Sequence, residues 1–301
     1  MRPSFARAGE RGALVIPRPV FGTLIAVISG LCFSSGGYFV RSVSIDSWEI
    51  IVLRCFFAAI AVALIFVARE RGRVLASLKE AALPSLVIGL FTGWAIIAYV
   101  LAMQYTQVAN VVAIMTTSTL LVALFARPFL GERVPLHTWI AMLGGLCGIG
   151  VMFSGAAELS GFYGNLLAFS IAVSIAAQTL IARKFRNVRM EPAVLFSALV
   201  AGIAALPVAL PLTASAHDVA MMAAFGIVQL AIPLTLYFYA ARYISAPTLI
   251  FVVLIDAVFA PIWVWLGFDE VPARLAFIGA ALILVSVGFN AGLSVRAMRR
   301  G

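Results

Sequence analysis

Residues 249–263 read LIFVVLIDAVFAPIW, an apolar run that carries one carboxylic acid, Asp256, in its middle. A helix needs about 20 mostly apolar residues to cross the roughly 30 Å hydrocarbon core of a bilayer. The run extends on both sides to residues 246–266, which gives it that length. This segment therefore predicts a transmembrane helix with an acid near its centre.

The rest of the chain has the same character. Of its 301 residues, 63% are hydrophobic and 11% are charged, and the mean hydropathy is +1.10. Soluble domains are about half apolar and about a quarter charged. The composition therefore indicates an all-α integral membrane protein, because a membrane β-barrel would show shorter segments of alternating polarity. The net charge of +9 is spread over many short segments, so we expect no nucleic acid partner.

Ten apolar segments follow one another along the chain, and each is long enough to span a bilayer. They lie near residues 20–40, 48–68, 83–103, 108–128, 137–154, 162–182, 193–212, 219–240, 246–266 and 274–294. Nearly all of the 21 Lys and Arg residues fall in the tails and in alternate loops, which the positive-inside rule assigns to the cytoplasm. We therefore expect a multi-pass inner-membrane protein with cytoplasmic tails at 1–19 and 295–301.

The second half of the sequence repeats the first. YVLAMQYTQVAN at 99–110 matches YFYAARYISAPT at 237–248, and the same offset carries Glu132 onto Glu270. Each half therefore contains five spans. Because five is odd, the second half must lie upside down relative to the first.

Ten transmembrane helices are thus expected as two inverted five-helix repeats, at residues 20–154 and 162–294. Inverted repeats are typical of secondary transporters, whose substrate site lies near the bilayer midplane where the halves meet. The pattern predicts transport by alternating access, in which the site opens to one side of the membrane and then to the other.

Three motifs recur in the two halves. They are AMQYTQVAN, LGERV and GGLCGIGV in the first half and AARYISAPT, FDEVP and GAALILVSVGF in the second. Together with Arg54 near the start of the second span, they resemble the ten-span EamA-type exporters of the drug/metabolite transporter superfamily. The resemblance implies export of small metabolites without a cofactor, and its aromatic amino acid exporter (YddG-like) branch is the nearest in character. The proline that the family usually carries in spans four and nine is replaced here by Thr119 and Ala257.

Asp256 is the single acid in the middle of a span, where a charge costs about 3 kcal/mol on insertion scales. It is a candidate for proton coupling or for binding a substrate ammonium group, and its alternative role is a neutral hydrogen bond between helices. Arg54 is the single base within a span, and either contacts a substrate carboxylate or reaches along its helix toward the surface. We favour a structural role for Arg54.

Other polar side chains in the spans are candidates for the wall of a central cavity. They are Ser34, Tyr38, Tyr99, Thr116, Ser118, Gln178, Gln229 and Tyr237. A lone polar group in a membrane helix more often joins two helices, so each candidate alone is weak. Tyr99 and Tyr237, which are mates in the repeat, and Ser118, the mate of Asp256, are the most informative of them.

Two further motifs have structural interpretations. Glu132 and Glu270 begin spans five and ten, where a carboxylate suits the positive end of a helix, so both are expected to cap helices. Gly144 and Gly148 have the small-xxx-small spacing that allows two membrane helices to approach closely. No metal-binding motif is apparent.

The few charged residues within the spans limit the class of substrate. One Arg and no Lys within the spans argue against phosphorylated substrates, and a single acid argues against multiply charged cations. Aromatic or other hydrophobic amino acids fit what remains, and a monomer in the lipid bilayer would suffice. The alternative is an exporter of cationic drugs or quaternary amines that pair with Asp256. An intramembrane enzyme is a remote alternative, because the spans hold no second acid or clearly internal histidine.

Overall fold

The computed structural model describes residues 17–70, 72, 74–106, 108–154, 161–269 and 274–300. Every regular element in this part of the chain is helical. Among the described residues nine helices are long and apolar enough to cross a membrane, and the shorter apolar helix Leu136–Met152 makes a tenth segment. The predicted all-α fold with ten membrane segments is therefore confirmed.

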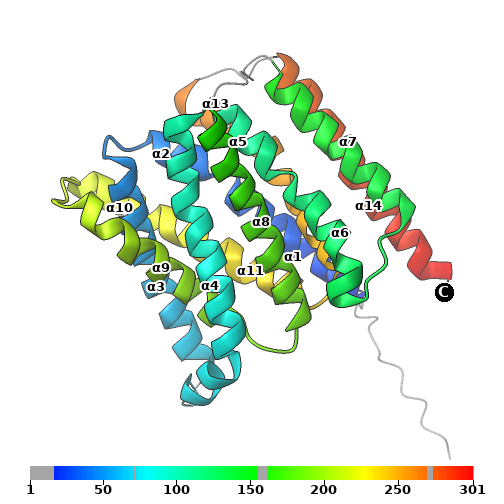
Figure 1. The fold of residues 1–301 in the computed structure, drawn as a ribbon, viewed down its shortest axis with the longest axis horizontal. Coiled ribbons are helices and arrows are strands. Elements are labelled where there is room, and N and C mark those ends of the chain that lie inside the picture. The colour runs from blue at the N-terminus through cyan, green and yellow to red at the C-terminus, as the bar shows by residue number, and fades with distance from the viewer. Residues whose placement is uncertain are drawn as a thin grey trace, which may run out of the picture.

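Five segments make up the first half (Figure 1). They are α1 (Arg18–Phe33) with α2 (Gly36–Arg41), α3 (Ser47–Glu70), α4 (Val74–Tyr105), α5 (Val108–Met115) with α6 (Ser118–Leu130), and α7 (Leu136–Phe153). Five more make up the second half. They are α8 (Phe162–Lys184), α9 (Glu191–Ala209), α10 (Ala216–Phe225) with the π-helix η1 (Gly226–Ala231) and α11 (Ile232–Ala240), α12 (Ala246–Val253) with α13 (Ile255–Phe268), and α14 (Arg274–Arg300).

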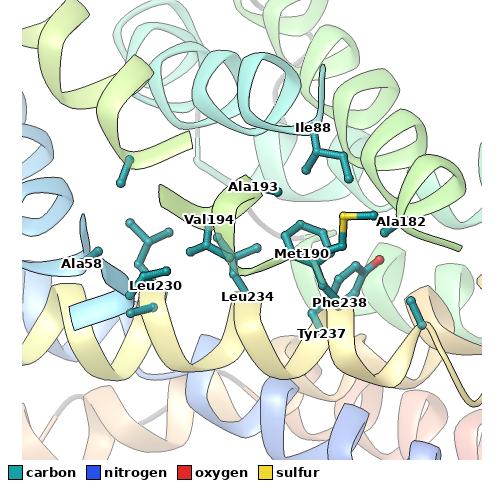
Figure 2. Close-up of a cluster of buried hydrophobic side chains, with 14 of the residues drawn as sticks. Ala58, Ile88, Ala182, Met190, Ala193, Val194, Leu230, Leu234, Tyr237 and Phe238 are labelled. Carbon is teal, nitrogen blue, oxygen red and sulfur yellow. The ribbon is translucent and has the colours of Figure 1, made fainter. Parts of the chain in front are cut away.

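The two halves pack against each other along their lengths. Helix α3 lies on α9, α4 lies on α8 and α9, α1 lies on α11, and α7 lies on α14 at one edge of the bundle (Figure 1). The largest buried cluster lies at this boundary, where Ala58 and Ile88 of the first half meet Val194, Leu234 and Phe238 of the second (Figure 2). Lipid is as apolar as these side chains, so close packing rather than escape from water holds the helices together.

Glycine permits the closest approaches. A β-carbon on Gly148 of α7 would lie 2.8 Å from the carbonyl oxygen of Gly279 in α14, and one on Gly144 would lie 2.6 Å from Ser286 Oγ. Both distances are shorter than an ordinary contact, so a larger side chain would push α7 and α14 apart. The predicted role of Gly144 and Gly148 in close helix packing is confirmed.

Four spans are irregular in their middle. Span one breaks between α1 and α2, span four between α5 and α6, span nine between α12 and α13, and span eight contains the π-helix η1. The breaks in spans four and nine fall at Thr116 and Leu254, which are mates in the repeat. A π-helix inside a longer helix, like a mid-helix break, often marks a functional position.

The break in span four forms without the proline that the family usually carries. The hydroxyl of Thr116 donates to the Ala113 carbonyl at 2.7 Å, and that of Thr117 donates to the Ile114 carbonyl at 2.6 Å. Such bonds to the preceding turn compete with the helix ladder and bend it. Hydroxyl groups therefore accompany the interruption that a proline would otherwise produce.

The helices finish and begin at two opposite ends of the bundle. The Glu132 end is where α3, α6, α8 and α11 finish, and the Glu49 end is where α3 and α10 begin. At the Glu49 end, the buried Glu49 carboxylate accepts bonds from the backbone N–H groups of Thr213 and Ala214 at 2.6 and 2.7 Å. These bonds join the two halves at that end.

Candidate functional site

The broken helices place a polar residue at the start of two half-helices. Asp256 is the second residue of α13, directly after the break at Leu254, and it is half-buried. The first turn of a helix carries partial positive charge from its free N–H groups, which favours a carboxylate there. Ser118, its mate in the repeat, is the first residue of α6 and is buried. The fold thus brings two helix N-termini into the interior of the bundle and gives a carboxyl group to one of them.

Tyr99 of α4 lies in the same region of the bundle as Arg54 of α3 and Asp256 of α13. The ion pairs recorded among the described residues lie elsewhere and include neither Arg54 nor Asp256. Three of the predicted site residues therefore lie in one region, where neither the Arg54 guanidinium nor the Asp256 carboxyl group belongs to an ion pair recorded among the described residues.

Arg54 contacts an aromatic ring rather than an acid. Its guanidinium carbon lies 5.1 Å from the ring centroid of Phe225, at the end of α10, which is a cation–π distance. Its buried Nε has no hydrogen-bond partner. The structural role expected for Arg54 stays a prediction, but a buried N–H donor without a partner is costly unless a ligand or water meets it.

Tyr237 and Gln178 join helices. The Tyr237 hydroxyl donates to Thr179 Oγ1 at 2.6 Å, because the Thr179 hydrogen is used on the Ile175 carbonyl. Gln178 Oε1 accepts a short hydrogen bond from the Thr92 hydroxyl. Both Tyr237 and Gln178 are buried, so these bonds tie α8 to α11 and to α4.

Ser34 and Gln229 both serve the break in span one. Ser34 Oγ accepts from Trp263 Nε1 of α13 at 2.8 Å and donates to the Leu31 carbonyl at 2.6 Å. The Gln229 side-chain amide, carried by η1, donates to the Phe33 carbonyl at 3.4 Å. The irregular span eight therefore supplies a donor to a carbonyl at the end of α1.

Tyr38 and Thr116 lie apart from the polar bonds just described. Tyr38 is exposed and lines a groove of about 560 Å³ formed by α1, α2, η1 and α13, with Trp263 on its wall. Thr116 is half-buried and its hydroxyl serves its own helix.

The expectation for Glu132 was wrong about which helix it caps. Helix α7 begins at Leu136 without a capping side chain. The Glu132 carboxylate instead accepts from Arg183 Nε at 2.6 Å and from the backbone N–H of Ala246, the first residue of α12, at 3.1 Å. The turn that ends α6 directs the side chain toward the other half rather than along the chain. Glu270 lies outside the described residues.

Sequence reasoning missed several partners of these groups. Thr179 adjoins Gln178, and a run of two polar residues inside a span could have drawn attention to it. Thr92, Trp263 and Phe225 carry no such signal, because each meets its partner through a contact between distant segments.

The sequence profile of the EamA-like transporter family matches the chain twice, at residues 20–154 and at residues 162–291. The chain belongs to the EamA-like transporter family. It is therefore a multi-pass membrane transporter of the drug/metabolite superfamily, and the resemblance seen in its motifs is confirmed at that level. Each matched range contains one of the two breaks that the repeat pairs, the break in span four in the first range and that in span nine in the second.

Two curated relatives cover nearly the same length. An uncharacterized transporter of Archaeoglobus fulgidus is 26% identical over 267 residues, which is 89% of this chain and 95% of the relative. The pseudopaline exporter CntI of Pseudomonas aeruginosa is 26% identical over 276 residues, which is 88% of this chain and 94% of the relative. A solved crystal structure with 19% sequence identity aligns with a TM-score of 0.78 over 91% of this chain and 98% of its own, which supports the fold alone.

Proposed function

We propose that this EamA-family transporter exports small zwitterionic metabolites across the inner membrane, with aromatic and other hydrophobic amino acids as its substrate class. The observation that carries the proposal is that Arg54, Tyr99 and Asp256 lie in one region, and that Arg54 and Asp256 belong to none of the ion pairs recorded among the described residues. A dipolar substrate offers a carboxylate to the one and an ammonium group to the other. The rings of Tyr99 and Phe225 supply apolar surface for its side chain.

The cycle we propose is alternating access by a monomer whose termini both face the cytoplasm. The excess of basic residues in the corresponding loops supports this orientation. The paired breaks at Thr116 and Leu254 support rearrangement of spans four and nine around the site, because half-helices can tilt separately. Asp256, at the second of these breaks, is the candidate for proton coupling.

The test is efflux from proteoliposomes that contain the purified full chain. Vesicles loaded with labelled phenylalanine, tryptophan or leucine should lose label faster than protein-free vesicles, whereas a sugar phosphate should be retained. Arg54→Gln should slow amino acid efflux, and Arg127→Gln, which changes an exposed arginine near the end of α6, should not. Retention of all amino acids would refute the substrate class. Efflux of quaternary amines instead would favour the cationic-drug alternative, in which Asp256 binds the cation.

A further inference from the structure

The Glu132 end is closed by helices from both halves. Val122 of α6, Leu180 of α8 and Ile250 of α12 are buried together in one apolar cluster, and α6 packs on both α8 and α12. The repeat relates α6 to α13 and α12 to α5. Among the described residues, α5 and α13 do not form a closely packed pair. The same two spans therefore meet at one end of the bundle and separate toward the other.

Glu132 joins these three helices. It directly follows the end of α6. Its carboxylate accepts a hydrogen bond from Arg183 Nε of α8 at 2.6 Å and another from the first backbone N–H of α12 at 3.1 Å. Arg183 is itself fixed, because its Nη1 donates to the Ala241 carbonyl at 2.8 Å. The side chains of Arg183 and Glu132 are 11% and 20% exposed, so solvent screens their attraction only in part.

Helix α12 depends on the other half for its cap. Ser245, at its N-cap position, makes no capping bond with its side chain, and the Ser245 hydroxyl is hydrogen-bonded to Thr248 Oγ1 at 2.8 Å. The first free N–H of the helix, on Ala246, is met by Glu132. A carboxylate at this position interacts favourably with the positive end of the helix. The bond therefore holds a half-helix of the second repeat to the first repeat.

The local sequence around Glu132 builds this geometry. Gly131 has φ 69°, a left-handed conformation that glycine adopts at no steric cost, and it ends α6. The backbone N–H of Glu132 then bonds back to the Ala126 carbonyl at 3.3 Å. This turn fixes the glutamate above the end of its own helix, where its side chain reaches α8 and α12.

We propose that Glu132 is a latch that holds the Glu132 end shut, by binding Arg183 and the N-terminus of α12 at the same time. The inference rests on the alternating-access cycle proposed above, since it assigns one residue to one of its two states. Opening of this end separates α12 from α6 and breaks both bonds together. The Arg69–Glu191 pair at the same end joins α3 to α9, which pack along their lengths, and it has no such role.

The test is hydrogen–deuterium exchange of the full chain in lipid nanodiscs, which needs no substrate. Glu132→Gln keeps an acceptor for the Ala246 N–H but loses the charge, and amides in residues 120–130, 176–183 and 248–254 should then exchange about tenfold faster. The matched control is Glu191→Gln. It breaks the Arg69–Glu191 ion pair at the same end and should leave the exchange rates of these segments unchanged. Arg183→Lys, which keeps the charge but has no Nε donor, should reproduce the effect of Glu132→Gln.

Three results would overturn the latch. They are unchanged exchange in both Glu132→Gln and Arg183→Lys, faster exchange restricted to the first turn of α12, and an equal effect of Glu191→Gln. The second result would reduce Glu132 to a local helix cap. Exchange is measured without substrate. If the unmodified protein shows no amino acid efflux in proteoliposomes, the proposed function fails and the latch still stands.

Discussion

The interrupted spans and the paired unbroken spans of this protein have different contents. Where spans one, four and nine break, the structure has Ser34, Ser118 and Asp256, and their neighbours are donors such as Trp263 and Gln229. Where α7 lies on α14, Gly148 and Gly279 allow the backbones to approach closely, and one buried hydrogen bond, from the Thr138 hydroxyl to Asn290 Oδ1 at 2.8 Å, joins the two helices. The comparison teaches that the breaks place polar side chains beside free helix ends, whereas the polar groups of the α7–α14 pair bond each other across a close backbone approach.

The two matched breaks also differ from each other. Span four has consecutive hydroxyl groups at its break, and two of them bond the preceding turn. Span nine has no hydroxyl there, and its turn is made by backbone bonds from Leu254 to Phe251 and from Ala257 to Leu254, each 3.2 Å long. The two spans are thus interrupted at matching positions with different side chains. Of the two, only span nine has a carboxyl group at its break, that of Asp256, where span four has Ser118.

The largest effect is expected from Asp256→Asn. If Asp256 carries the coupling proton, efflux driven by a pH gradient should fall about tenfold or more in the variant. Asparagine cannot bind and release a proton, and the sequence has no second acid in the middle of a span. Efflux down a substrate gradient alone should fall less. The measurement is proteoliposome efflux with and without an imposed pH gradient. Ser118→Ala, at the matched break, is the control and should retain most activity; full gradient-driven efflux by the aspartate variant would remove proton coupling from this residue.

An intermediate effect is expected in the unbroken pair. Gly148→Leu should lower the free energy of unfolding by about 1–3 kcal/mol, because overpacking forces helix α7 away from the Gly279 backbone. Thermal unfolding in detergent measures the change. Gly150→Leu is the matched control in the same helix, since a β-carbon there meets nothing within 4 Å. Equal melting temperatures for the two variants would show that this approach of the helices contributes nothing to stability.

The smallest effect is expected for Tyr237→Phe, which removes one hydrogen bond between α11 and α8 and leaves the apolar ring in place. Hydrogen bonds between membrane helices contribute about 0.6 kcal/mol on average, so the unfolding free energy should fall by about that amount. Tyr163→Phe, on an exposed tyrosine, provides the comparison. If instead Tyr237→Phe slows amino acid efflux without changing stability, Tyr237 acts on the substrate rather than as a tie between helices.

Much of the architecture was predictable from the chain alone. Ten apolar segments, an odd-numbered repeat and the Gly144–Gly148 spacing are properties of position along the sequence, and each has a direct physical consequence in a bilayer. The depth of Asp256 followed in the same way, from its place in the middle of an apolar run.

Only the tertiary structure decided the partners. Its position predicts that Glu132 caps the helix that follows it, yet its carboxylate bonds Arg183 and Ala246, which are 51 and 114 positions away. Tyr99 lies in the same region as Arg54 and Asp256, and the Gln229 amide bonds the Phe33 carbonyl, through packing that no local pattern encodes. Hydropathy and periodicity determine which segments enter the membrane, because transfer into lipid depends on each segment by itself. Which polar groups meet there depends on how helices distant in sequence pack and rotate against one another, and a polar side chain in lipid is stabilised by whichever partner that packing brings within reach.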